Sequence, residues 1–369
     1  STAWALRHAG CEVTLFDQAS LPNERGSSVD QHRLIRHAYG AEEGYTRMIQ
    51  HAFAAWGQMW EDLGTSYYHQ TGTFVGVSNG QTWAQESLAT LTRVGIPVER
   101  LTQSEMASRW PFIRCDDFDE AFYLATGGAL FTRALLTGLT RYLWTIGVDI
   151  RQQQHVIDVD LARATVHLAG GYSEQGDTVV VAAGPWVTKL LPKTRALVTP
   201  SRQTVFYVTP PAKLQQAWST APMLLDIGSK NGIYVVPPVA GASMKVGDHS
   251  FSMSGDPDHQ RIEKQGERQQ IESLCSRRFH DFHRYRTGEA RICFYTVQPE
   301  ERFILKRDGP SLVMTGFSGH GFKFGALMGQ AARAAVLDPD SAPAIEQWAA
   351  GRTMHLPFDI HDHKSARPV

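Results

Sequence analysis

Hydrophobic and polar positions recur along this chain with two periods, one typical of helices and one of strands. Over residues 45–63 the large apolar side chains Met48, Phe53, Trp56 and Trp60 recur at helical spacing, which predicts a core helix. Apolar spacing together with glycine stops and polar caps predicts further helices at residues 1–9, 82–95, from 101 onward, 132–147, 326–336 and 345–348. Residues 256–287 are polar and helical in pattern, as in a solvated outer helix pair.

Short apolar or alternating runs predict strands between these helices. The runs lie at residues 11–16, 67–77, 148–150, 155–160, 164–168, 177–183, 199–209, 232–238, 242–249 and 311–315. A helix at 1–9 followed by a strand at 11–16 is the second half of a βαβ unit. The first strand and the GxGxxG loop that open such a unit are absent from the chain as given, and residues from 355 onward have the pattern of a loose tail.

Length and charge bound the class of protein. The chain has 369 residues, 42% hydrophobic content and a net charge of −1, so it can bury a large core in about two domains. Its charges are mixed without a basic tract, which argues against nucleic acid or an anionic membrane as partner. No apolar run is long enough to span a bilayer and no signal-peptide pattern opens the chain. We therefore expect a soluble protein.

Cysteine and histidine usage gives no metal signature. The four cysteines Cys11, Cys115, Cys275 and Cys293 are scattered, which favours free thiols in a reducing compartment over a disulfide framework. Fifteen histidines are dispersed without an HExxH motif, and His361 and His363 belong to the polar tail. We expect no metal centre.

A glycine-rich turn at residues 315–324, Thr-Gly-Phe-Ser-Gly-His-Gly-Phe-Lys-Phe, follows a predicted buried strand and precedes a predicted helix. Free backbone N–H groups and the helix dipole at such a turn favour an anion, or a ring that becomes anionic on reduction. A flavin is such a ring. A plain glycine-rich turn with a surface lysine is the alternative interpretation.

Two arginines, Arg33 and Arg36, flank the apolar pair Leu34 and Ile35 in residues 26–40. If the segment is helical, the two guanidinium groups lie close to one face. Cations held so close to apolar side chains need an anion. Two solvated arginines, or two structural ion pairs, are the alternatives.

Lys245 and His249 stand four apart in a predicted strand, so their side chains point to the same side. A fixed ammonium in a dry site stabilises negative charge. Without further context such a pair on a strand is usually exposed at the surface. Cys293, in the run Cys-Phe-Tyr-Thr-Val-Gln-Pro-Glu, would likewise usually be a buried inert thiol.

Taken in order along the chain, these motifs resemble the monomeric sarcosine oxidase and N-methyltryptophan oxidase group of the D-amino-acid-oxidase-like flavoprotein superfamily. The resemblance covers nearly the whole chain. It implies an α/β (α+β two-domain) flavoprotein. A Rossmann-like FAD-binding domain, N-terminally incomplete in the given chain, would comprise residues 1–65, 129–198 and 288–369. An antiparallel-sheet substrate domain would comprise residues 66–128 and 199–287.

The resemblance also implies a role for particular residues. In catalysis Arg33 would lie against the flavin and Lys245 would act near its N5 through a water, while His249 and Tyr234 line the pocket. The substrate-binding residues would be Arg36 and Lys323, on the carboxylate, and Tyr295. FAD would be bound by Asp17 at the ribose, Val156 at the adenine, Cys293 through a covalent 8α bond, and Ser27, Gly319, His320, Gly321, Phe322 and Lys323. Asp248 departs from the family, in which an uncharged residue is common, and would favour a more cationic or longer substrate if it faced the pocket.

The reaction implied is oxidation of the C–N bond of a secondary or N-methylated amino acid to an imine, with O₂ reduced to H₂O₂. A cytoplasmic monomer is expected. Sarcosine, proline, pipecolate and bulkier N-alkyl amino acids all remain open as substrates. A flavin-dependent dehydrogenase with another electron acceptor is the main alternative. A non-catalytic apo scaffold is suggested only by the absent phosphate loop, and a dehydrogenase using NAD(P) alone would not need the late flavin-facing turn.

Overall fold

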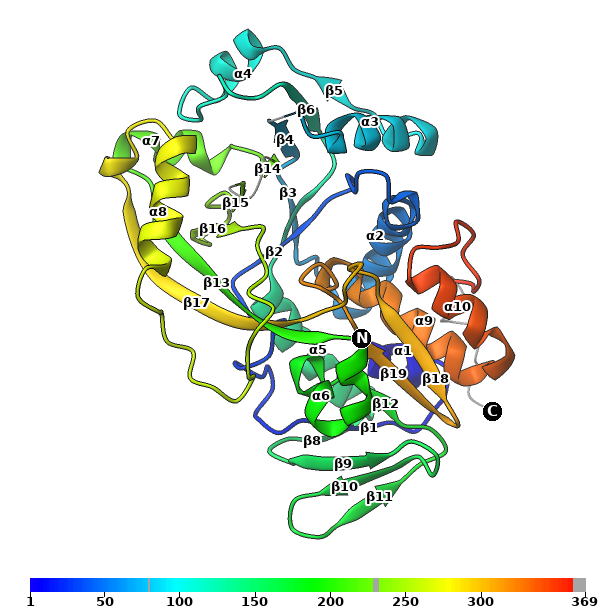
Figure 1. Ribbon diagram of the computed structural model, residues 1–369. Coiled ribbons are helices and arrows are strands. Elements are labelled where there is room, and N and C mark those ends of the chain that lie inside the picture. Colours follow the sequence, from blue (N-terminus) through cyan, green and yellow to red (C-terminus); the bar gives the residue numbers. More distant parts are fainter. Residues whose placement is uncertain (79, 228–231, 361–369) are drawn as a thin grey trace.

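A computed structural model describes residues 1–78, 80–227 and 232–360, in which helices alternate with strands that form several separate sheets. Figure 1 shows α3 (Trp83–Val94) and α4 (Gln103–Arg109) at one end and a small hairpin sheet at the other. That small sheet consists of β9 (Val156–Asp160), β10 (Thr165–Leu168) and β11 (Ser173–Gln175).

Parallel strand pairs and buried helices make up the region that contains both described ends of the chain. β1 (Thr14–Phe16) runs parallel to β8 (Asp149–Arg151), and β12 (Val180–Val181) runs parallel to β19 (Ser311–Thr315). β18 (Ile304–Asp308) closes the second of these sheets in antiparallel pairing. One core contains side chains from α1 (Thr2–His8), α2 (Glu43–Leu63), α5 (Thr132–Thr145), α9 (Gly325–Leu337) and α10 (Ala342–Ala349). Because α9 is apolar on nearly all sides, it lies at the centre of this packing.

An eight-stranded sheet forms the second large unit and is antiparallel except for one pair. Its order is β17 (Arg286–Val297), β13 (Thr199–Thr209), β16 (Met244–Asp248), β15 (Ile233–Val236), β14 (Met223–Ile227), β4 (Thr73–Val77), β6 (Glu120–Leu124) and β5 (Glu99–Arg100). Only β14 and β4 run parallel. A second core joins this sheet to α8 (Glu267–Arg278) and to Trp218 of α7 (Ala212–Ser219).

A short three-stranded sheet contains Arg33 of the arginine motif. It has the order β2 (Arg33–Ile35), β7 (Gly128–Leu130) and β3 (Tyr68–Gln70). The short turns α6 (Val187–Leu190), η1 (Gly184–Trp186) and η2 (Pro192–Ala196) follow β12, and η3 (Phe282–Arg284) precedes β17.

The structure confirms most predicted helices and strands and corrects four of them. Residues 33–35 form strand β2, so the helical interpretation of the arginine segment is wrong. Residues 67–77 form two strands that are interrupted near Gly72, which has φ +73°. The strand at 177–183 is reduced to β12, and residues 256–287 contain one long helix, α8, after an irregular segment. The predicted cap at residues 101–106 is a capping box formed by Thr102 and Glu105.

Three further expectations concern membrane spans, metal ligands and domain bounds. In the described ranges no helix is long and apolar enough to cross a membrane. Within the same residues no three His, Cys, Asp or Glu side chains gather as metal ligands. His361 and His363 lie outside the described part of the chain. The division into domains at the residues given above stays a prediction.

Candidate functional site

The glycine-rich turn after β19 lies directly against strand β17. Gly316 has φ +70° and Gly319 has φ +79°, and η4 (Phe322–Phe324) then leads into α9. A Cβ atom on Gly319 would lie 2.4 Å from the ring of Tyr295, so only glycine fits there. The turn therefore brings Gly319 next to Tyr295 of β17.

Arg36 and Lys323 meet around the side chain of Tyr39. The Lys323 Nζ, 4% exposed, donates to the Tyr39 hydroxyl at 3.0 Å. The Arg36 guanidinium carbon lies 4.6 Å from the centre of the Tyr39 ring and 5.8 Å from that of Trp83. The buried Nε and Nη1 of Arg36 have no hydrogen-bond partner. Among the described residues, neither cation has a carboxylate within ion-pair distance. A buried guanidinium left in this state indicates a place for an anion.

His320 determines which atoms donate and which accept in the hydrogen bonds of Tyr39. The His320 Nε2 lies 3.0 Å from the carbonyl oxygen of Glu301, which can only accept, so Nε2 carries the hydrogen. The Nδ1 atom is then the acceptor for the Tyr39 hydroxyl, 3.4 Å away. Burial, and after it the charge of Lys323, lowers the pKa of His320 to about 3. A neutral His320 thus directs the Tyr39 oxygen lone pairs toward Lys323.

Both cations are held in surroundings that disfavour their charge. Burial, and then the charge of Arg36, lowers the pKa of Lys323 well below its usual range. Burial likewise lowers the pKa of Arg36. Perturbed titratable groups of this kind cluster at functional sites. The pair is therefore a strong candidate for binding an anionic ligand group.

A second cluster is centred on Asp30, which the sequence analysis did not single out. Asp30 Oδ2 accepts from Lys245 Nζ at 3.0 Å and from Nη1 of Arg33, while its Oδ1 accepts from the hydroxyl of Tyr207. Lys245 also donates to the carbonyl oxygen of His32. Burial raises the pKa of Asp30, but the charges of Arg33 and Lys245 outweigh it and hold that pKa well below the usual range. The predicted fixed ammonium of Lys245 is therefore already paired with a carboxylate.

Cys293, Tyr295 and Tyr234 adjoin this second cluster. Cys293 is buried in β17 opposite Gln203, and burial raises the pKa of its thiol while the charge of Arg33 opposes that change. Burial raises the pKa of Tyr295 and of Tyr234, on which the Arg33 charge also acts. Tyr234 packs over Gly247, where a Cβ atom would lie 2.6 Å from its ring. These side chains from β15, β16 and β17 thus share one electrostatic environment.

His249 links the two clusters, and Asp248 does not. The rings of His249 and Tyr234 lie 5.8 Å apart. His249 is exposed to solvent, yet desolvation by the protein around its ring, helped by the charge of Arg36, lowers its pKa to about 4. Asp248 instead accepts from Gln270 Nε2 of α8 at 3.2 Å, on the opposite face of β16 from Lys245. The idea that Asp248 selects a cationic substrate is thus not supported.

The remaining predicted cofactor residues lie apart from the two cation clusters or at their margin. Asp17 follows β1, and its Oδ1 accepts from the Ala19 amide at 2.9 Å and from Asn23 Nδ2 at 2.8 Å. The Ser27 hydroxyl donates to the Phe294 carbonyl. Val156, half-buried, begins β9. In the described chain no hydrogen bond joins Asp17 or Val156 to either cluster.

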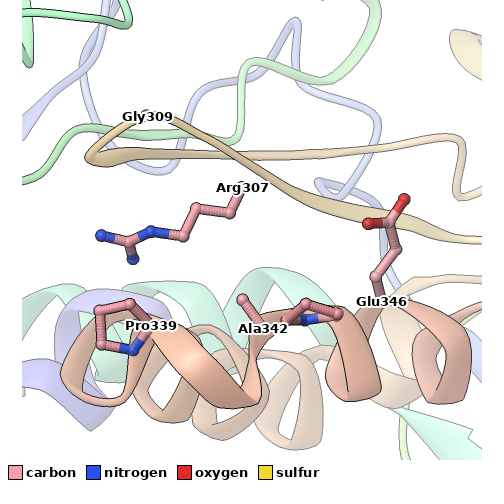
Figure 2. Close-up of a pocket in the computed structure, with 6 residues that line it drawn as sticks. Arg307, Gly309, Pro339, Ala342 and Glu346 are labelled. Carbon is pink, nitrogen blue, oxygen red and sulfur yellow. The ribbon is translucent and has the colours of Figure 1, made fainter.

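A cavity of about 280 Å³ lies elsewhere, between the β18–β19 turn and α10. Figure 2 shows Arg307 and Glu346 on opposite sides of it, and its lining is completed by Gly309, Pro339, Ala342 and Pro343. None of the predicted site residues lines this cavity.

Three comparisons with known proteins bear on these clusters. The family model described as "FAD dependent oxidoreductase" (DAO) matches residues 1–335. A monomeric sarcosine oxidase from Bacillus sp. (strain NS-129) is 26% identical over 343 residues, covering 89% of this chain and 88% of that protein. An N-methyl-L-tryptophan oxidase from Yersinia pestis (strain Pestoides F) is 27% identical over 360 residues, covering 93% of each.

Among solved structures, an L-proline dehydrogenase from P. horikoshii has a TM-score of 0.80. It is 16% identical, and the match covers 95% of this chain and 93% of that one. At that identity the likeness shows the fold alone. The predicted fold class is confirmed.

Proposed function

Because this chain belongs to the FAD dependent oxidoreductase family, we propose that it oxidises the C–N bond of a secondary or N-methylated amino acid to an imine. The observation that carries this proposal is the pair Arg36 and Lys323. Lys323 is buried, the buried Nε and Nη1 of Arg36 lack a hydrogen-bond partner, and neither cation has a carboxylate within ion-pair distance among the described residues, the charge of Glu301 acting on both from farther away. The matched relatives named for oxidising sarcosine and N-methyl-L-tryptophan support the same substrate class.

The chain's own contribution begins with binding the substrate carboxylate. Charge-assisted hydrogen bonds to this carboxylate can come from the unpartnered Nε and Nη1 of Arg36 and from the ammonium of Lys323. Such a clamp fixes the carbon beside the substrate nitrogen in one place, which lowers the entropic part of the barrier. Tyr39 and neutral His320 hold Lys323 in the donating orientation.

The donor set of the second cluster fits a flavin. Arg33 and Lys245 supply positive charge, Cys293 supplies a thiol on the same side, and Gly319 leaves the turn free of a Cβ atom. We propose that Asp17, Ser27, Val156 and residues 319–323 complete the FAD site. When bound, FAD supplies the two-electron acceptor for the hydride of the substrate carbon.

No dedicated base is required by this scheme. Hydride transfer needs the substrate amine to be neutral, and a desolvated pocket favours the neutral amine. His249, with a pKa near 4, is itself neutral at pH 7 and adds no positive charge beside that amine. Tyr234 and Tyr295, whose pKa values are raised, stay protonated and keep their hydroxyl donors.

O₂ is the proposed electron acceptor, giving H₂O₂, and water then hydrolyses the imine. A covalent bond from Cys293 to FAD, a monomeric state and a cytoplasmic location belong to the same proposal. The four cysteines, which are free in the structure, support a reducing compartment.

A dehydrogenase with another electron acceptor is the second candidate. One specific observation favours it: the ammonium of Lys245, the group expected to assist O₂, is paired at 3.0 Å with Asp30, whose charge offsets part of its own. Stopped-flow mixing of the reduced protein with air-saturated buffer separates the two. A reduced flavin that persists for minutes would rule out the oxidase.

Substitution of Arg36 tests the proposed function. For Arg36→Gln we expect KM for an N-methyl amino acid to rise by about 100-fold, because a charge-assisted bond to a buried carboxylate contributes about 1.5–3 kcal/mol and Lys323 alone remains. The same variant should lose little activity toward the matching N-methylamine, which has no carboxylate. Equal losses on both compounds would contradict a carboxylate role. Arg47→Gln, at an ion pair on α2, is the matched control.

A further inference from the structure

Asp30, near the proposed cofactor site, accepts hydrogen bonds from four donors. It is 2% exposed, and its two oxygens accept from Lys245, Arg33, Tyr207 and the amide of Gln31. Its own backbone is tied to the start of α5, because Thr132 Oγ1 bonds both its carbonyl, at 2.8 Å, and its amide, at 3.1 Å. The carboxylate therefore has one fixed position.

The surroundings of Lys245 make this carboxylate necessary. The ammonium is 2% exposed and shares Asp30 Oδ2 with the guanidinium of Arg33. Desolvation and a neighbouring cation both disfavour a buried ammonium. The titratable and charged groups that face it are Asp30 and His32 before β2, Arg33 in β2, Cys293 in β17 and, through Asp30, Tyr207 in β13. Asp30 is the carboxylate among them.

We propose that Asp30 is a positioning residue that keeps Lys245 protonated and holds its ammonium in the orientation in which it faces the cofactor. This inference rests on the proposed function, since it assumes FAD beside Lys245. With Asp30 in place the cluster has two cations and one anion. Without Asp30, the Lys245 amine beside Arg33 gives up its proton, so that removing the carboxylate also removes the ammonium.

The direction of the pH effect follows from the same contacts. The pKa of Lys245 is lowered to about 8 by burial and by Arg33, and Asp30 opposes that change. An amine is charged below its pKa, so Lys245 is mostly charged at pH 7 in the parent protein. Loss of Asp30 lowers that pKa further, and the charge is then lost at a lower pH.

Sulfite binding measures this charge without turnover. Sulfite adds to the electron-poor flavin ring and leaves negative charge on it, so a nearby ammonium tightens binding. The quantity to follow is the ratio of the sulfite Kd of a Lys245→Met variant to that of its Lys245 counterpart, from pH 6 to pH 9. Because sulfite's own ionisation affects both proteins equally, it cancels in this ratio.

With Asp30 present we expect a ratio of at least about tenfold at pH 7 and below, falling toward one above pH 8. A tenfold ratio corresponds to about 1.4 kcal/mol, less than two unit charges about 5 Å apart supply at an effective dielectric constant of about 20. In an Asp30→Asn background we expect a ratio near one already at pH 7.5. The same ratio and pH dependence in both backgrounds would overturn the inference. Failure of the parent protein to bind FAD would instead count against the proposed function.

Two further variants keep the test informative. Asp226→Asn removes the charge of another buried aspartate. Asp226 lies in β14, is 4% exposed and pairs with Arg278 of α8 at 2.9 Å. It should lower the melting temperature but leave the Lys245 ratio unchanged; a ratio that fell as it does in Asp30→Asn would show a general effect of lost ion pairs and overturn the inference. If Asp30→Asn does not fold, Asp30→Glu keeps the charge but displaces it. Its ratio at pH 7.5 should fall below the parent's, and an undiminished ratio would contradict a positioning role.

Discussion

The hydroxyl of Tyr39 connects Lys323 to His320 and so determines how the ammonium is oriented. Its ring, in addition, lies beneath the guanidinium of Arg36. One tyrosine thus contacts both members of the cation pair, the hydroxyl serving Lys323 and the ring serving Arg36. These two contributions can be separated by removing the oxygen alone.

Tyr39→Phe should raise KM for the amino-acid substrate by about tenfold with a smaller change in kcat, since one hydrogen bond to a charged group is lost. Steady-state kinetics measure the split. Tyr142→Phe removes a similar tyrosine hydroxyl, 3.2 Å from His8 Nε2, away from the site and should leave KM unchanged. An equal KM for Tyr39→Phe and the parent would contradict the assigned role of the hydroxyl.

Cys293 is the residue on which covalent attachment of FAD depends. Its thiol is buried near the charges of Arg33 and Lys245, which stabilise a thiolate against the effect of burial. After acid precipitation we expect yellow colour in the pellet of the parent protein and in the supernatant of Cys293→Ser. Cys275→Ser, at a buried thiol in α8, should behave like the parent. Free flavin from the parent would refute the bond and leave the fold intact.

At the scale of elements, the turn between β19 and α9 depends on its close approach to β17. Gly319 has both a left-handed φ of +79° and the Tyr295 ring beside it. Backbone strain and steric overlap therefore act together at this position, whereas most turn glycines have only the first.

Gly319→Ala should displace Tyr295 and cost activity as well as about 2 kcal/mol or more of stability, the sum of left-handed strain and overpacking. Gly10→Ala is the matched control, because Gly10 has φ +85° with nothing within 4 Å of the added Cβ. It should cost about 1 kcal/mol and no activity. Melting temperatures and kinetics of the two variants check this, and equal losses would argue against the Tyr295 contact.

Elements with local signals could be predicted from the sequence, and those that depend on distant partners could not. The 45–63 helix follows from Met48, Trp56 and Trp60 alone. Strand β2 could not be predicted, because three residues gain their conformation from pairing with β7, nearly one hundred positions later. Asp30 was missed for the same reason: its partners Tyr207 and Lys245 lie 177 and 215 positions away. Its only local signal was an acidic residue three before Arg33.

For the whole molecule, buried histidines make stability depend on pH. His37 is 4% exposed, its Nδ1 lies 3.0 Å from the Thr126 hydroxyl, and burial lowers its pKa to about 4. His32 and His320 are lowered to about 3 by burial first. In each case the unfolded chain binds the proton more readily than the folded protein.

The free energy of unfolding should therefore be highest above pH 6.5 and fall as the pH drops from 6.5 to 4. His37 alone should account for about 3 kcal/mol of that loss. Denaturant unfolding at several pH values measures it, and His37→Gln should flatten the dependence. His280→Gln, at an exposed histidine, should leave it as in the parent. A parent curve that is flat between pH 6.5 and 4 would contradict the burial of neutral His37.

Segments far apart in the chain thus converge on two adjoining cation clusters. One has no ion pair within the described residues, and the other is organised by Asp30. The most direct test of this arrangement is a crystal structure of the protein with FAD and an N-methyl amino acid or an unreactive analogue of one. We predict the ligand carboxylate on Arg36 and Lys323, with the flavin ring beside Lys245 and Cys293. A carboxylate bound elsewhere, or Arg36 paired with a protein carboxylate in that complex, would contradict the account.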